Sequence, residues 1–130
     1  MSQTPPPTGK ALVESMAKLL WQEYPGHFGG ALSKELAGPN TTGSQRLDFR
    51  ISRYAPMAYV QEHVHQVQEQ VYYVLEGEGV LTLDEQRHLM RPNDYVYVPP
   101  GVRHSFHNTG TAGLVFLVIT TPAADHEEAR

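Results

Sequence analysis

Two histidines separated by one residue, His63 and His65, open the stretch HVHQVQEQVYYVLEGEG at residues 63–79. On a β-strand, residues two apart project from the same face, about 6.6 Å apart along the backbone. Two imidazoles at that spacing can approach one metal ion at about 2.1 Å each. A closed site needs more ligands, and His104 follows a Pro-Gly turn in the stretch VPPGVRHSFHNTG. These three histidines are the candidate metal ligands.

The other histidines are interpreted as surface residues or as hydrogen-bonded core residues: His27, His88, His107 and His126. His107 has the strand parity opposite to that of His104, so its ring would point away from the candidate site.

Most of the chain consists of short β-rich runs separated by turn signals such as GPNTTGS, EGEG, RPND and NTGTAG. Strands of this length with closely spaced turns predict an all-β sandwich or barrel. No helical pattern separates them, as a parallel βαβ sheet would require. Residues 11–24 differ, because apolar side chains recur there at helical spacing. They predict one short amphipathic helix, with Thr8 as its cap and Pro25-Gly26 as its end.

The expected strands are apolar on both faces. Residues 57–65 and 70–75 alternate without a fully polar face, and residues 114–119 are apolar throughout. A strand with one solvated face shows polar alternation. One face would therefore line a barrel interior and the other would pack against a second sheet or subunit, which predicts a homodimer. In the alternative, the N-terminal helix alone covers the outer face.

The composition argues against several classes of function. The 130 residues suffice for one domain with a single core. Ten basic against 14 acidic side chains, with no basic run, argue against nucleic acid as the main partner. No apolar run approaches the roughly 20 residues of a membrane helix. The chain has no cysteine for a disulfide or a thiolate ligand and no secretory signal pattern, so a cytoplasmic location is expected.

Two spaced motifs resemble those of the cupin family. The first, G(x)5HxH(x)3–4E(x)6G, is matched by His63, His65 and Gly77, and the second, G(x)5PxG(x)2H(x)3N, by Pro99, Gly101, His104 and Asn108. The resemblance covers about residues 46–121 and implies a double-stranded β-helix barrel (a jelly roll), a metal ion inside it and commonly a dimer. The expected organisation is a flexible segment at 1–8, the helix and lead-in strands at 9–45, the barrel at 46–121 and a tail at 122–130.

The first glycine of each motif is replaced, by Met57 and by Asn93. Asparagine tolerates the left-handed turn conformation that glycine would supply, so the turn after Pro92 is expected to persist. Methionine tolerates it less well, and the start of the first motif is expected to be irregular.

The glutamate of the first motif is replaced by Gln70. The resemblance makes Gln70 the fourth metal ligand, through its amide oxygen. Glu69 would then be a solvated neighbour or a group that orients a histidine. Three neutral histidines and a neutral amide leave a divalent ion with its full charge, which favours an anionic or enolate-like ligand.

Residues that share the parity of the histidines would line the substrate pocket: Tyr59, Gln61, Tyr72 and Phe106. Tyr72 follows Gln70 by two residues and could act as a hydrogen-bond donor or general acid. The preferred alternative is a packed wall residue with a satisfied hydroxyl. In RLDFRISRY, Arg53 ends a face shared with Leu47, Phe49 and Ile51. An arginine there would suit a substrate carboxylate, and its alternative is a surface residue in a turn.

Three functions fit these observations. The first is an enzyme of isomerase or lyase type that uses a divalent metal as a Lewis acid on a small oxygenated molecule. The second is an iron-dependent dioxygenase, and the third is a sugar- or metabolite-binding module without catalysis. Zinc, nickel, iron, manganese and copper all accept imidazole ligands, so the residues do not select the metal.

Overall fold

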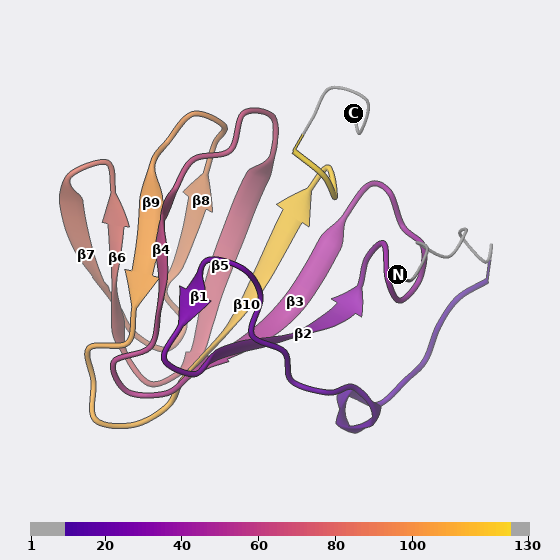
Figure 1. Cartoon of the computed structure of the whole chain (residues 1–130), viewed down its shortest axis with the longest axis horizontal. Helices are drawn as coiled ribbons and strands as arrows, with labels where there is room; N and C mark the ends of the chain where they lie inside the picture. Colours follow the sequence, from indigo (N-terminus) through magenta and orange to yellow (C-terminus); the bar gives the residue numbers. More distant parts are fainter. Residues whose placement is uncertain (1–9, 126–130) are drawn as a thin grey trace.

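The structure is a computed structural model, and it describes residues 10–125. Two five-stranded antiparallel sheets face each other and enclose the core (Figure 1). One sheet has the strand order β1-β4-β9-β6-β7 and the other β2-β3-β10-β5-β8. The strands are β1 (His27–Phe28), β2 (Ala31–Ala37), β3 (Asp48–Tyr54), β4 (Tyr59–His63), β5 (Glu69–Glu76), β6 (Gly79–Leu83), β7 (Gln86–Met90), β8 (Tyr95–Val98), β9 (His104–His107) and β10 (Leu114–Thr121). The all-β jelly-roll prediction is confirmed.

The predicted N-terminal helix is wrong. Residues 11–24 contain only a three-residue 3-10 turn, η1 (Met16–Lys18), and otherwise run extended along the molecule. Gln22 forms an isolated β-bridge with Ser33, and the side chain of Leu20 is 81% exposed. An isolated helix of this length is marginal in water unless its apolar stripe packs against a core. These apolar side chains find no such partner, so helical spacing alone does not produce a helix here.

An aromatic cluster fills the barrel between the two sheets. It consists of Tyr54, Tyr72, Phe106 and Phe116, whose ring centroids lie between 4.9 and 6.3 Å apart. All four residues are buried, and Val74, Leu81 and Leu114 are fully buried in the same core. Tilted and edge-on ring pairs at these separations are favourable beyond the apolar area they bury. Three of these residues, Tyr54, Tyr72 and Phe116, also line a cavity inside the barrel.

Both replaced motif glycines adopt left-handed backbone conformations. Asn93 has a φ of 73°, and its side-chain oxygen accepts a hydrogen bond from the Tyr73 hydroxyl, so the expected turn after Pro92 is present. Met57 has a φ of 75°, and its N–H donates to the carbonyl of Asn108. A side chain at such a φ costs about 1–2 kcal/mol relative to glycine. The start of the first motif therefore keeps the turn geometry despite the wrong residue type.

The pairing of β4 with β9 brings the two histidine motifs together. His63 lies opposite His104, and Val60 lies opposite Phe106, so β4 contains one extra residue between these two pairs. Such a bulge reverses the alternation of side chains along the strand.

Within residues 10–125, no helix has the length and apolar character needed to cross a membrane.

Candidate metal centre

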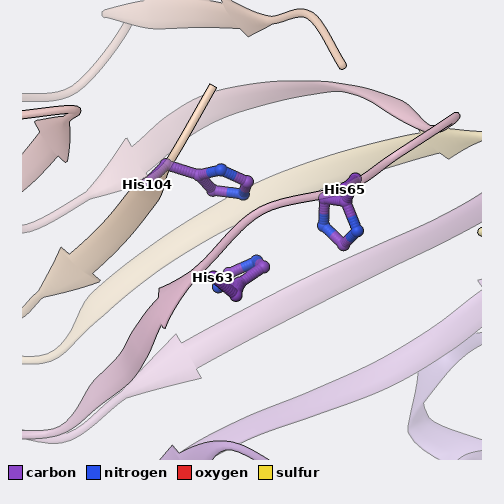
Figure 2. Close-up of side chains that lie close together, drawn as sticks. All are labelled: His63, His65 and His104. Carbon is purple, nitrogen blue, oxygen red and sulfur yellow. The ribbon is translucent and has the colours of Figure 1, made fainter. Parts of the chain in front are cut away.

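Three histidines converge from two segments of the chain, the end of β4 with the loop after it and the start of β9 (Figure 2). His63 ends β4, His104 begins β9, and His65 lies in the loop between β4 and β5. Their candidate ligand nitrogens all lie within 4.8 Å of one another. The three predicted ligands therefore form one group on the wall of the barrel interior, as a shared metal ion would require.

Two of the histidines are oriented by backbone carbonyls. The Nδ1 atom of His63 lies 2.8 Å from the carbonyl oxygen of Gln61, and that of His104 lies 3.0 Å from the carbonyl oxygen of Val102. A carbonyl can only accept, so Nδ1 carries the proton and Nε2 offers its lone pair. Burial lowers the pKa of His104 to about 4, so this imidazole is neutral at pH 7.

His65 is held differently. Its Nδ1 lies 3.8 Å from the carboxylate of Asp125, while its Nε2 is buried and has no hydrogen-bond partner among the described residues. Burial and the neighbouring His63 lower its pKa. A buried nitrogen without a partner is costly, and a bound cation would remove that cost. This orphaned atom is the first sign that the group fits a metal ion.

Gln70 supplies the second sign. Its Oε1 lies 2.8 Å from the Nε2 of His104, and its Nε2 donates to the hydroxyl of Thr120. With Nδ1 of His104 protonated, the 2.8 Å contact joins two acceptor atoms. Two ligands at right angles on one ion, each about 2.1 Å away, lie about 3 Å apart. The separation matches two ligands of one cation, and the donor set of three imidazoles and an amide oxygen suits a divalent transition metal.

Tyr72 lies beside this group with its hydroxyl satisfied. The phenol donates to Oε1 of Gln70 at 3.3 Å, and burial raises its pKa well above the ordinary range. It is therefore a neutral donor that helps to orient the amide. This geometry is that of a packed wall residue with a satisfied hydroxyl.

The pocket residues expected from strand parity are only partly found on the cavity wall. The cavity has a volume of about 430 Å³, and Gln61 and Tyr72 line it together with the two histidines of β4 and its loop and with Gln70. Tyr59 does not, because the bulge in β4 turns Val60 inward in its place. The Tyr59 ring instead stacks on His107. Phe106 is fully buried in the aromatic cluster.

The arginine on the cavity wall is Arg50, and Arg53 is exposed on the other face of β3. The inward face of β3 is polar at Asp48, Arg50 and Ser52 because it borders a cavity. The face that carries Leu47 and Ile51 turns outward. The parity assigned from sequence was therefore inverted in this strand, since apolar residues were assumed to point inward.

Glu69 is exposed, and in the described part of the chain its carboxylate accepts a hydrogen bond only from the Tyr97 hydroxyl, at 3.4 Å. It is thus a solvated neighbour, and it does not orient a histidine.

Two further residues at the site escaped sequence reasoning. Asp125 accepts hydrogen bonds of 2.7–3.0 Å from the backbone N–H groups of residues 66–68, and these bonds lower the pKa of its carboxyl despite the opposing effect of burial. These partners are 57–59 positions away in the chain, so no local pattern could reveal the contact. His27, interpreted as a surface or core residue, lines the cavity with its Nδ1 bound to the carbonyl of Pro25.

Comparisons with known proteins agree with this fold. An uncharacterized protein from Methanocaldococcus jannaschii is 29% identical over 99 residues, which are 76% of this chain and 79% of that protein. A predicted oxalate decarboxylase from Thermotoga maritima superposes with a TM-score of 0.76 at 23% identity, covering 85% of this chain and 99% of that one. The polyketide cyclase RemF from Streptomyces resistomycificus superposes with a TM-score of 0.75 at 21% identity, covering 86% and 80%. Both superpositions establish the fold. Residues 50–120 match the family model of the cupin domain, and the chain therefore belongs to the cupin family.

Proposed function

We propose that this cupin is a metal-dependent enzyme that acts on a small oxygenated molecule. His63, His65 and His104 would hold one divalent ion, with the amide oxygen of Gln70 as the fourth ligand. The observation that carries the proposal is the convergence of three imidazoles within 4.8 Å, two of which, with Gln70, line a cavity of about 430 Å³. Bound there, the ion would act as a Lewis acid that polarises a substrate oxygen and stabilises developing negative charge. Isomerase or lyase chemistry fits this role best.

The protein residues prepare the site for such an ion. The carbonyls of Gln61 and Val102 hold the protons of two imidazoles on Nδ1 and leave both Nε2 atoms free. The Tyr72 hydroxyl and the Thr120 hydroxyl fix the amide of Gln70 so that its oxygen faces His104. The aromatic cluster gives the cavity an apolar wall at Tyr54, Tyr72 and Phe116, and electrostatic interactions beside such a wall are stronger than in water.

Elemental analysis of untagged protein purified without chelator tests the metal centre. We expect close to one divalent ion per chain, and loss of most of it in the His104→Ala variant with the barrel still folded. Stoichiometric metal in His104→Ala would refute the ligand assignment.

The identity of the metal then directs the activity screen. Zinc, nickel or manganese leads to keto sugars and hydroxy acids, whereas iron leads to oxygen-uptake assays and the dioxygenase alternative. If no metal binds, the non-catalytic binding module becomes the better explanation.

We also propose that the chain forms a homodimer through the outer face of the sheet that contains β5, β8 and β10. Large apolar side chains gather there on adjacent strands: Val71, Tyr73, Tyr95, Tyr97 and Ile119. Tyr95 is 71% exposed, and a contiguous apolar patch of this kind is typical of an interaction surface. Light scattering should give twice the 14.5 kDa mass of one chain. The Tyr95→Arg variant should shift the measured mass towards that of the monomer.

A further inference from the structure

A pair of opposite charges lies inside the barrel, on the wall of the same cavity as the histidines. Asp48 and Arg50 project from β3, and the carboxylate accepts two hydrogen bonds from the guanidinium. The Nε–Oδ1 distance is 2.8 Å and the Nη2–Oδ2 distance is 2.9 Å. Histidines aside, these two are the only acidic and basic side chains among the described residues that line the cavity.

The ion pair leaves half of the guanidinium available. A guanidinium presents two edges that can each bind a carboxylate with two hydrogen bonds. Asp48 occupies the edge formed by Nε and Nη2, whereas the edge formed by Nη1 and the second hydrogen of Nη2 has no partner among the described residues. The Arg50 side chain is 24% exposed, and the space it borders is the cavity. Arg50 therefore borders the space that a substrate would occupy, with one edge of its guanidinium not engaged by Asp48.

The guanidinium is also fixed in orientation before any ligand arrives. The Cζ atom of Arg50 lies over the ring of Tyr24, 4.0 Å from the ring centroid, which is a cation–π contact. With one edge on Asp48 and one face on Tyr24, little side-chain entropy remains to be lost on binding. A buried ion pair contributes little net stability, because desolvation offsets the attraction. A purely structural role therefore explains poorly why both charges border a cavity.

Arg50 and the histidine group act on the same space. His27 stands on the cavity wall, and burial, Arg50 and His63 all lower its pKa. Both groups are thus within electrostatic reach of one side chain. The same cavity wall also carries uncharged polar side chains, including the hydroxyls of Ser33, Ser52 and Thr120.

From this arrangement we propose that Arg50 is the anchor for a substrate carboxylate, and that the substrate is a small acid with a second oxygen group that reaches the histidine centre. This inference names the substrate class of the proposed metal enzyme and rests on that function for the second contact only. The free guanidinium edge would bind the carboxylate with two hydrogen bonds, and Asp48 would hold the guanidinium in place.

Unbranched acids of increasing length test the inference without knowledge of the true substrate. Malonate, succinate, glutarate and adipate are titrated into the metal-loaded protein, each beside the monocarboxylate with the same number of carbons. We expect at least one dicarboxylate to bind about tenfold or more tightly than its monocarboxylate, as two charge-assisted hydrogen bonds would give. Equal binding of both acids at every length would overturn the proposal.

The variant Arg50→Lys keeps the charge that Asp48 needs and removes the second edge. It should fold, which circular dichroism checks, and it should lose most of the preference for the dicarboxylate. Arg53→Lys is the matched control, because it makes the same change three residues along β3 on the exposed outer face. A preference that survives in Arg50→Lys would also overturn the proposal.

Titration of metal-free protein with butyrate, followed by NMR, separates this inference from the metal centre. A single carboxylate then has Arg50 as its partner, and Arg50→Lys should weaken its binding several-fold while Arg53→Lys does not. If the protein proves unable to bind metal but shows this dependence, the proposed function fails and the anchor stands. If metal binds at one ion per chain while acid binding is the same in both variants, the anchor fails and the metal centre stands.

Discussion

The three candidate ligands are held in two different ways. His63 and His104 lie opposite each other on paired strands, and each ring is tethered by a carbonyl two residues earlier in its own segment. His65 lies in a loop, and the loop is fastened by Asp125 from the far end of the described chain. The barrel itself therefore determines two ligand positions. The third depends on a contact between residues that are distant in sequence, and it should be the easier one to loosen.

Removal of a strand-borne ligand should have the largest effect. His104→Ala deletes one imidazole from a set of three and is expected to weaken metal binding by at least about a hundredfold, more than the loss of an orienting partner does. Isothermal titration with zinc measures the affinity, and circular dichroism checks that the barrel is intact. A zinc affinity within a few-fold of the wild type would show that His104 is not a metal ligand, and that the two histidines on β4 and β9 do not determine zinc binding.

Release of the loop should come second. Asp125→Ala removes the acceptor of three backbone N–H groups and the carboxylate beside Nδ1 of His65. We expect metal affinity to fall about 10- to 100-fold, as is usual when a group that orients a ligand is lost. Glu85→Ala is the matched control, because it removes an exposed carboxylate in the turn between β6 and β7. If both variants bind zinc like the wild type, the loop holds His65 without help from Asp125.

A third substitution restores the motif. Gln70→Glu puts a carboxylate at the position of the amide oxygen that faces His104, on a strand rather than in the loop. It should tighten divalent metal binding by up to about tenfold, because charge-assisted contacts are stronger than neutral ones. It should also weaken the binding of succinate or glutarate, since the bound ion then carries less net charge. Unchanged metal affinity would exclude Gln70 from the ligand set.

The smallest effect is expected at the turn before β4. Met57→Gly relieves a φ of 75° at an exposed position and should raise the free energy of unfolding by about 1 kcal/mol. Thermal unfolding measures this as a rise of a few degrees in Tm. Zinc affinity should not change, because His63 is positioned by strand pairing and not by this turn. A loss of zinc affinity would mean that the conformation of the turn at Met57 affects the position of His63.

The sequence predicts those parts of the molecule whose determinants are local. The spacing of His63 and His65 and the Pro-Gly turn before His104 point to the three histidines that the structure brings together, although His65 lies in the loop after β4 and not on the strand that was expected to carry both. The left-handed turn at Asn93 follows from the tolerance of asparagine for that conformation.

The predictions that failed concern features that depend on tertiary structure. Tyr59 was expected to line the cavity and does not, because β4 contains one extra residue. That residue is visible only once β4 is paired with β9. The inward and outward faces of β3 were predicted the wrong way round, because the face that borders the cavity is polar at Arg50. The helix at residues 11–24 did not form because its apolar side chains find no surface to cover. Asp125 could not be found at all, since its partners lie 57–59 positions away in the chain.

The aromatic cluster also constrains how molecules pass through this protein. Tyr54, Tyr72 and Phe116 line the cavity, and a ligand cannot pass between their packed rings. A product that keeps the anchoring carboxylate would still occupy Arg50, so it has to leave before the next substrate can bind there. Such a product would inhibit competitively as it accumulates, and its release would limit turnover.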